Sequence, residues 1–506
     1  MKIVTAEFQK IFSKKTFLLL IVALVVNWVL LGYGTQQQYR YAAPPEAYRQ
    51  VFAELEGKSE TEKLSFLQEK LDRLNACRLL ESQATAEEYS EERNFSEEEL
   101  ALMELYREDY ENQSFLEYTD NLYMEITFVE GIYQQAKSVT EYDAMVDGVL
   151  EEAETKTGIS IFSEPDSFSY RNLKNAAAKF ETMYGTPTTF DISEGVNTAT
   201  KSIATDLIVV LILLFVSGEL IIREKERGLL PIIKSTKNGR LRVILSKIAV
   251  LLGLSVFCSF LFFGENLLYA QMTFGLGDLS RSIQSVSGYL TSPLHLSVGE
   301  YFLCFFLVKA AAYFLAAMLA MLACVLLFHP APAYLCVAVV IGVSYVLYGS
   351  ILPVSRWNLF RYLNLANFLS VTPLFDSYQN LNLFEYPFEV LPASLVTMGI
   401  LLLLFVFLCI WVFCVKKTSE HSLRLPRFLH LKKRPKTGRS VSLFYHESFK
   451  LLMSNKALIL LILFALFQWN NAKSSVFYSP DEMYYKSYMT ALGGPLTPEK
   501  EQYLAD

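Results

Sequence analysis

The sequence predicts an all-α, polytopic membrane protein. Of its 506 residues, 52% are hydrophobic, and these residues are clustered in long blocks instead of following amphipathic periods. A helix that crosses the ~30 Å hydrocarbon core of a bilayer needs about 20 mostly apolar residues, because its backbone polar groups must be bonded within the segment. Seven blocks meet or approach this length. This pattern excludes an ordinary soluble globular protein.

The first six apolar blocks are predicted membrane spans, and a short surface helix precedes them. Residues 1–15 contain four lysines and an apolar stripe of Val4, Phe8 and Ile11, which predicts an amphipathic helix at the membrane surface. A cleaved signal peptide is disfavoured, since Asn27 and Trp28 interrupt the first block and no small-x-small cleavage site follows. The predicted spans are residues 16–34, 201–222, 248–274, 298–328, 334–352 and 389–415.

The basic residues predict the orientation of these spans, because Lys and Arg near span ends are retained in the cytoplasm. Residues 1–15 contain four lysines, residues 223–247 contain eight basic residues, and residues 416–439 contain nine. All three segments fall on the same side if the spans alternate. We therefore expect a cytoplasmic amino terminus, a cytoplasmic hairpin at 223–247 and a basic cytoplasmic linker at 416–443.

The segment between the first two spans, residues 35–200, is a predicted extracellular domain. It contains 34 Asp and Glu residues against 14 Lys and Arg residues. Apolar residues recur at spacings of three and four, which predicts helices, and Ser96 followed by Glu99 has the form of a capping box. Its acidity has two interpretations. It is either a solvated surface or an electronegative vestibule that gathers cationic peptides.

An internal repeat predicts that a second, similar unit begins near the end of the chain. The stretch AEFQKIFSKKTFLLLIVAL from Ala6 is echoed by HESFKLLMSNKALILLILF from His446, with Glu7 aligned to Glu447. Residues 444–470 are therefore a predicted surface helix and seventh span, and residues 471–506 begin a second extracellular domain. Because the sequence stops within that domain, we expect a duplicated protein that is truncated in its second half.

Motifs for catalysis and metal binding are scarce. The sequence has no GxxxxGK[ST] loop, no HExxH and no CxxC pair, and its five histidines are not spaced as metal ligands. We predict no catalytic, cofactor or metal site and no nucleic-acid partner. Ionisable and amide side chains within spans are functional candidates because burying them is costly. Glu265, Asn266 and Lys309 are therefore a possible substrate path, although Glu265 and Lys309 could instead form a structural pair.

The hairpin after the second span, REKERGLLPIIKST, predicts a docking surface. Gly228 is expected to end a charged helix, and Asn238 with Gly239 is expected to form a turn before the next helix. A loop that only determines topology would explain the basic residues. It would not explain four apolar residues in water: Leu229, Leu230, Ile232 and Ile233.

These residues resemble the ABC-2 type permeases, the membrane subunits of ABC exporters. In that family an elbow helix precedes the first span, and a loop often written R-E-x-E-x-G-(T/L) follows the second span and docks on the ATPase. Residues 1–15 match the elbow, and residues 353–388 lie where the family has short re-entrant helices. The resemblance covers about residues 1–415 and again 440 onward, although the large extracellular domain is not in the minimal family pattern. The loop motif is matched at Arg223, Glu224, Glu226, Gly228 and Leu229.

The resemblance implies a six-span exporter unit followed by the start of a second unit. It implies a plasma-membrane permease that exports a peptide, an antibiotic or a lipid-like substrate, with ATP and Mg²⁺ bound by separate P-loop ABC ATPase subunits. A second permease half would be its own missing half or another copy. The alternative function is a membrane sensor whose acidic extracellular domain binds a ligand such as a cationic peptide. The predicted coupling residues are Arg223, Glu224, Glu226, Arg227, Gly228, Leu229, Leu230, Ile232 and Ile233.

Overall fold

The computed structural model describes residues 2–11, 14–88, 95–158, 164–353 and 355–415, together with residues 464 and 468. The described residues up to 415 belong to one compact unit. They are mostly helical, and six helices are long and apolar enough to cross a membrane, which confirms the predicted all-α membrane fold. The predictions for residues 416–443 and 471–506, and nearly all of 444–470, lie outside the described residues.

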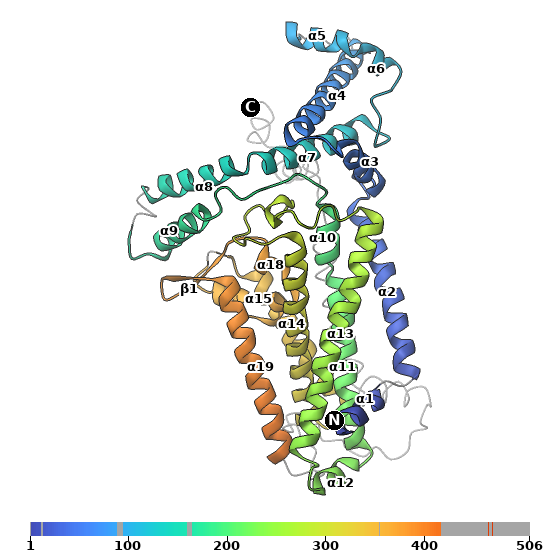
Figure 1. Ribbon diagram of the computed structural model, residues 1–506, viewed down its shortest axis with the longest axis vertical. Helices are drawn as coiled ribbons and strands as arrows, with labels where there is room; N and C mark the ends of the chain where they lie inside the picture. Colours follow the sequence, from blue (N-terminus) through green and yellow to red (C-terminus); the bar gives the residue numbers. More distant parts are fainter. Residues whose placement is uncertain are drawn as a thin grey trace, which may run out of the picture. The chain divides into compact units, whose positions relative to one another are not determined.

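The six long helices run side by side as a bundle (Figure 1). Between 61% and 72% of the apolar stretch is buried in three of them, and α14 packs against the other two of these three. In the remaining three helices only 17% of the stretch is buried. Their apolar side chains therefore form the outer surface of the bundle. The inner helices are α11 (Ile203–Glu226), α13 (Leu241–Thr273) and α14 (Val298–Leu326), and the outer ones are α2 (Lys14–Gln38), α15 (Pro330–Ser350) and α19 (Val390–Val415).

Two short helices lie at one end of the bundle, which we call the base (Figure 1). These are α1 (Lys2–Ile11) and α12 (Leu229–Ser235). In α1, Ile11 is buried in the bundle core, whereas Val4 and Phe8 are exposed. The predicted stripe of Val4, Phe8 and Ile11 is therefore divided, because Ile11 packs against the bundle whereas Val4 and Phe8 lie on the exposed face of the helix.

At the opposite end the chain forms a helical head, residues 45–192. Its core lies between α4 and α7 and includes Val51, Leu74 and Ile132. The predicted capping box is confirmed, because the Ser96 hydroxyl accepts from Glu99 N and the Glu99 carboxylate accepts from Ser96 N. The head consists of α3 (Pro45–Leu55), α4 (Glu60–Glu88), α5 (Glu97–Leu105), α6 (Arg107–Glu111), α7 (Leu122–Thr140), α8 (Tyr142–Thr157) and α9 (Phe168–Glu181).

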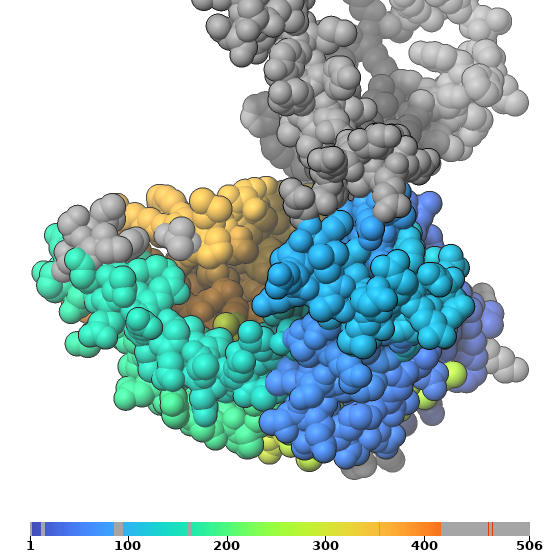
Figure 2. Space-filling model, turned by 90° about the horizontal axis from the view of Figure 1, so that it is seen from above, coloured from blue at the N-terminus to red at the C-terminus, as the bar shows by residue number. Residues whose placement is uncertain are grey.

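The head-side face also carries segments that connect the long helices. Figure 2 views this face, with the head in blue to teal and the region around the end of α15 in gold. Helix α10 precedes α11, and the short helix η1 lies between α13 and α14. Three short helices and a hairpin lie between α15 and α19. These elements are α10 (Glu194–Thr200), η1 (Ile283–Ser285), α16 (Asn358–Tyr362), α17 (Leu365–Ser370), α18 (Thr372–Phe375), β1 (Asn380–Leu383) and β2 (Tyr386–Glu389).

The antiparallel hairpin of β1 and β2 is a feature that the sequence analysis did not predict. Its register places Leu381 opposite Phe388, and its two-residue turn has positive φ at Phe384 (53°) and Glu385 (68°). Positive φ at both central positions is the geometry of a type I′ turn, which normally selects Asn and Gly. The sequence therefore lacked the usual hairpin signal.

The β1–β2 hairpin forms hydrogen bonds with α9 of the head. Nη1 of Arg171 donates to the Glu385 carbonyl oxygen at 3.2 Å, and Phe168 N donates to Glu385 Oε2 at 3.2 Å. Nδ2 of Asn380 donates to Oδ1 of Asn172 at 2.8 Å. The head is thus bonded to the segment that leads directly into α19.

We predict that Gly195→Ala destabilises the junction of α10 with the end of α13. A Cβ at Gly195 would lie 1.9 Å from the backbone oxygen of Gly275, so the two backbones would have to separate. Thermal unfolding in detergent should show a clearly lower Tm. Gly253→Ala on α13 is the matched control, because nothing lies within 4 Å of its added Cβ. Equal Tm values for the two variants would contradict this prediction.

Candidate functional site

Four charged side chains join α1 to α11 and α13 at the base, and we call them the base cluster. Lys247 of α13 is fully buried, and its Nζ donates to Glu7 Oε2 and to Glu224 Oε1, each at 2.9 Å. It also donates to the Leu220 carbonyl oxygen at 2.8 Å. Lys10 Nζ completes the cluster at 2.8 Å from Glu7 Oε1 and 2.9 Å from Glu224 Oε1.

The base cluster is electrically balanced, with two lysines and two glutamates in mutual contact. Burial by itself would lower the pKa of Lys10, but its hydrogen bonds to Glu7 and Glu224 outweigh this effect and raise the pKa. Removing one partner from such a buried arrangement leaves an uncompensated charge. Helix α1 is therefore fixed to the ends of two inner helices.

The chain turns sharply between α11 and α12. Gly228 has φ of 67°, in the left-handed region that glycine enters without steric cost. After the turn, Leu229 and Ile232 are 42% and 65% exposed, whereas Leu230 is 3% exposed and belongs to the bundle core. The expectation that Leu230 lies in water is therefore wrong, because one face of α12 packs back onto the bundle. Ile233 is half-buried against the same core.

The other predicted coupling residues divide in the same way. Arg223, Glu226 and Arg227 are exposed, and Arg223 pairs with Glu219 one turn earlier on α11. Glu224 is 6% exposed and belongs to the base cluster. Its carboxylate binds within the chain instead of facing outward. The outward-facing side chains, which we call the base surface, are Arg223, Glu226, Arg227, Leu229 and Ile232.

Two further lysines connect the base to α14 and α19. Lys225 Nζ donates to the carbonyl oxygens of Cys324, Val325 and Leu327 at 2.5, 2.8 and 2.7 Å, so a cation binds the free carbonyls at the C-terminal end of α14. Lys234 Nζ lies 4.4 Å from the ring centroid of Phe413 in α19. The sequence pattern indicates only that these lysines lie on the cytoplasmic side, and not which helices they contact.

Within the bundle, Lys309 of α14 forms an ion pair with Asp206 of α11. Its fully buried Nζ lies 2.6 Å from Asp206 Oδ1 and 2.8 Å from Oδ2, and Tyr313 OH donates to Oδ1 at 2.7 Å. Lys309 also donates to the carbonyl oxygen of Leu369 in α17. The pairing of Lys309 with Glu265 that the sequence suggested is therefore wrong. Asp206 was missed, although an acidic residue in a span is itself a signal.

Glu265 and Asn266 of α13 instead contact α2. Asn27 Nδ2 donates to Glu265 Oε2 and to Asn266 Oδ1, both at 2.9 Å, while Thr205 Oγ1 of α11 donates to Asn27 Oδ1 at 2.8 Å. Asn27 and Asn266 are fully buried. All three residues of the predicted substrate path thus form contacts between helices, and their role in a path stays a prediction.

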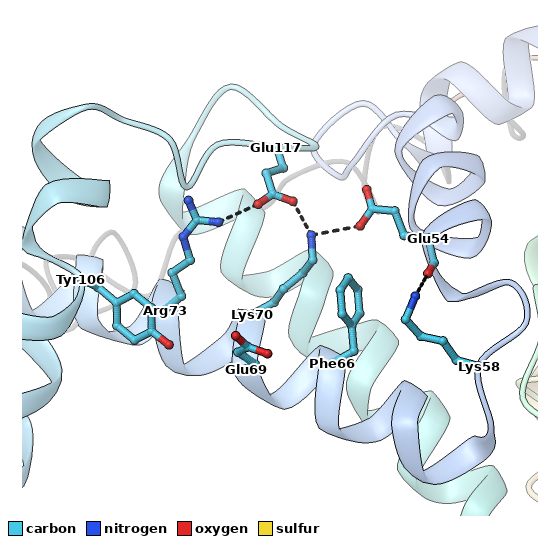
Figure 3. A pocket seen from close by; sticks show the side chains of 8 residues that line it. All are labelled: Glu54, Lys58, Phe66, Glu69, Lys70, Arg73, Tyr106 and Glu117. Atoms are coloured by element: carbon cyan, nitrogen blue, oxygen red, sulfur yellow. Dashed lines mark hydrogen bonds and ion pairs between the residues drawn. The ribbon is translucent and has the colours of Figure 1, made fainter.

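The head contains an open cleft of about 540 Å³ (Figure 3). Three basic and three acidic side chains line it, and several of them bind one another. Lys70 Nζ is 3.0 Å from Glu54 Oε2 and also binds Glu117, while Arg73 Nη1 is 2.7 Å from Glu117 Oε1. The lining is therefore balanced in charge. It consists of Glu54, Lys58, Phe66, Glu69, Lys70, Arg73, Tyr106 and Glu117.

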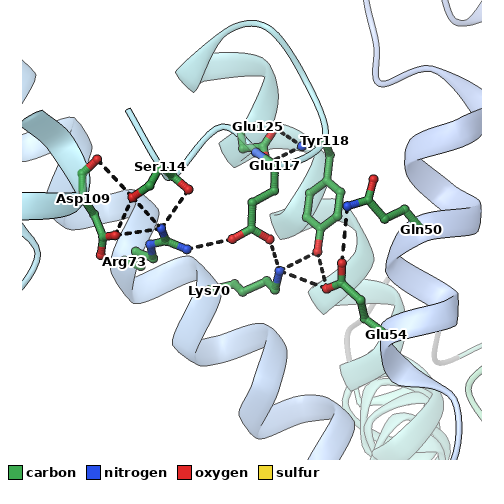
Figure 4. A network of polar contacts seen from close by, with 9 residues as sticks. All are labelled: Gln50, Glu54, Lys70, Arg73, Asp109, Ser114, Glu117, Tyr118 and Glu125. Carbon is green, nitrogen blue, oxygen red and sulfur yellow. Dashed lines mark hydrogen bonds and ion pairs between the residues drawn. The ribbon is translucent and has the colours of Figure 1, made fainter. Parts of the chain in front are cut away.

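The polar network of the cleft extends into the head core (Figure 4). Tyr118 OH donates to Glu54 Oε2 at 2.7 Å, and Ser114 Oγ donates to Asp109 Oδ1 at 2.6 Å. Burial alone would raise the pKa of Glu54, but the hydrogen bonds from Tyr118 and Lys70 lower it. The hydrogen bond from Ser114 is the main cause that lowers the pKa of Asp109. Across the described part of the chain, no cluster of three or more metal-binding side chains occurs.

Comparison with known proteins identifies one family. Residues 16–411 match the sequence pattern of a family described as ABC-2 family transporter protein. The match covers the head, the segment 223–247 at the base and the six long helices, apart from the first two residues of α2 and the last four of α19. No curated protein and no solved structure matches the chain.

We predict that Lys247→Met destabilises the protein far more than Lys10→Met. Lys247 is fully buried between two carboxylates, so its loss should cost about 3–5 kcal/mol. The Lys10 side chain is 52% exposed, and its ion pairs are partly screened by water, so its loss should cost about 1 kcal/mol or less. Thermal unfolding in detergent measures the difference. Similar Tm values for the two variants would show that the base cluster does not hold α1.

We predict that the head loses stability as the pH falls below the ordinary carboxyl range. The pKa values of Glu54 and Asp109 are lowered from 4.5 and 3.8, so their stabilisation is present above these values and is lost as pH falls through the folded-state pKa values. Tm should therefore fall with pH below about 4.5. A Glu54→Gln, Asp109→Asn variant should show a shallower fall, and parallel curves would contradict the prediction.

Proposed function

Because the chain belongs to the ABC-2 family of transporter proteins, we propose that its base surface docks a separate ATPase subunit whose ATP cycle drives export through the helix bundle. As a member of this family, the chain is a permease of an ABC transporter. The proposal assigns ATP and Mg²⁺ to the partner subunit, and it makes the chain a plasma-membrane exporter with a cytoplasmic base.

The observation that carries the proposal is the pair of exposed apolar residues on α12. Leu229 and Ile232 point away from the core at the charged end of the bundle, beside Arg223, Glu226 and Arg227. Apolar side chains with a charged rim are typical of a protein interface, in which a few buried anchors contribute most of the binding energy.

The same geometry supports transmission of movement from the ATPase into the bundle. Leu230 anchors α12 in the core, and Gly228 separates it from α11 by a sharp turn. The base cluster joins α1, α11 and α13, while Lys225 and Lys234 add contacts to α14 and α19. A displacement of α12 would therefore act directly on α11 and on α19. Through Glu224 and Lys225 of α11 it would also act on α13 and α14.

Helix α11 could transmit movement from the base to the head side of the bundle. It is one continuous helix from Ile203 to Glu226, with Glu224 bonded at the base and Asp206 bonded to Lys309 near the other end. Lys309 in turn donates to the carbonyl of Leu369 in α17. We infer that α11 carries base movements to the short helices between α15 and α19.

The proposal includes a second permease half, because rocking of two units is needed to open a path alternately to each side. That half would come from the repeat that begins near residue 444 or from another copy. The proposed substrate is a peptide, an antibiotic or a lipid-like molecule. The balanced charges of the head cleft give no particular support to the alternative function, a sensor for cationic peptides.

We predict that Ile232→Glu combined with Glu226→Lys prevents association with the ATPase. The changes place a carboxylate at the apolar anchor and reverse a neighbouring charge, and both positions are exposed, so the fold should persist. The measurement is recovery of a P-loop ATPase with the tagged protein from its native host, together with ATPase activity of the purified complex.

Leu105→Glu is the matched control, because Leu105 is also exposed but lies in the head. It should retain the ATPase fully. If the base variant retained the ATPase as well as this control does, docking at the base surface would be wrong.

A further inference from the structure

Four large apolar side chains are exposed where α15 is followed by α16 and the hairpin. Leu352, Trp357, Phe360 and Phe384 are 68%, 64%, 48% and 88% exposed, and we call them the aromatic corner. Trp357 and Phe360 stack with a centroid distance of 5.9 Å. Exposing this much apolar side-chain surface to water is unfavourable in free energy. An apolar or interfacial environment is therefore expected around the corner.

The segments of the aromatic corner are bonded together. Arg356 Nη2 lies 3.2 Å from Glu385 Oε1 in the hairpin turn, and Asn382 N donates to Asn358 Oδ1 at 2.9 Å. The Asn358 Nδ2 group also donates to the Asn380 carbonyl oxygen at 3.0 Å. The corner is therefore a built surface and not a set of isolated exposed residues.

The corner lies at the end of two membrane-spanning helices. Helix α15 has 21 residues, or about 31 Å at 1.5 Å per residue, which matches a hydrocarbon core of ~30 Å. At its end, Arg361 donates to the carbonyl oxygens of Tyr348 and Ile351 at 2.7 and 2.6 Å, and a guanidinium there indicates the polar edge of the membrane. On the other side of the corner, α19 begins directly after β2.

A shallow groove of about 360 Å³ forms part of the corner. Its lining combines two hydroxyl groups with aliphatic and aromatic side chains, and the charged Arg356 beside it is 80% exposed. The amphipathic indole of Trp357 beside a basic side chain is a combination found where acyl chains meet phosphate headgroups. The lining residues are Ser350, Ile351, Leu352, Ser355, Trp357 and Phe360.

The two long helices that flank the corner in the chain also have exposed apolar side chains. Val343 and Val346 of α15 and Val396 and Ile400 of α19 are exposed toward the outside of the bundle. In a membrane these side chains are covered by lipid. Because α15 leads into the corner and α19 follows its hairpin, lipid is favoured as the occupant of the corner.

We propose that the aromatic corner inserts into the head-side leaflet and binds phospholipid there, with the rings at the boundary between acyl chains and headgroups and Arg356 facing the phosphates. The corner thereby anchors the hairpin, and through it the head, to the membrane surface. The inference requires only a membrane-embedded bundle. It is therefore independent of ATPase docking, and either proposal can fail without the other.

The test uses the intrinsic fluorescence of Trp357 in the full chain. Trp28→Phe, Trp411→Phe and Trp469→Phe leave Trp357 as the sole tryptophan. The protein is placed in nanodiscs of phosphatidylcholine and phosphatidylglycerol that carry bromine either near the headgroup or near the chain end. We expect shallow bromines to quench at least about twofold more strongly than deep ones, with little quenching by aqueous iodide.

A variant that retains only Trp411 is the matched control, because Trp411 lies within α19 and is 54% exposed. Brominated lipid should quench it, which shows that insertion has succeeded. Strong iodide quenching of Trp357 without bromine quenching would place the corner in water and overturn the proposal. Absence of both would show that protein, such as a second copy, covers the corner, and would overturn it equally.

A second measurement keeps the test decisive if the triple variant does not fold. In the otherwise unchanged protein, Trp357→Phe should reduce the fluorescence that shallow bromines quench more than the fluorescence that deep bromines quench. A reduction confined to the iodide-sensitive fluorescence would contradict lipid contact at the corner.

Discussion

The hydrocarbon core of a membrane cannot form hydrogen bonds with polar groups, and this constraint determines which contacts join the helices of the bundle. Every ionisable or amide side chain buried in the bundle needs a partner, which a neighbouring helix supplies. Lys309 is bound by Asp206, Lys247 by Glu7 and Glu224, and Asn27 by its neighbours on α13. Between them these contacts involve α1, α2, α11, α13 and α14. Apolar packing alone would hold the same helices in less specific positions.

The lengths of the apolar blocks made the membrane fold predictable. The six apolar blocks became six long helices, and Ser96 with Glu99 formed the expected cap, because such signals depend on residues close together in the sequence. The polar pairings were not predictable in the same way. Asp206 and Lys309 are far apart in sequence, and only packing shows that Lys309 meets Asp206 and not Glu265. A one-sequence pattern identifies a buried charge but not its partner.

In the candidate docking surface, too, the sequence did not predict which individual side chains face the core. The motif after the second span located the base hairpin, but it could not separate Leu230, which faces the core, from Leu229 and Ile232, which face outward. Pro231 and the short length of α12 obscure any helical period. The hairpin before α19 was missed for a related reason, since Phe384 and Glu385 adopt a turn that usually selects Asn and Gly.

Helix α19 has a mechanical consequence that follows from its two ends. Near the base, Phe413 contacts Lys234 of α12, and at the other end the helix begins directly after β2, whose hairpin is bonded to α9. Because α19 is a stiff helix with contacts at both ends, a tilt caused by α12 at the base would displace the β1–β2 hairpin and the head at the other end. The height and angle of the head would then report the state of α12. Movement could also be transmitted in the reverse direction, since a force on the head would act on α12 through the same helix.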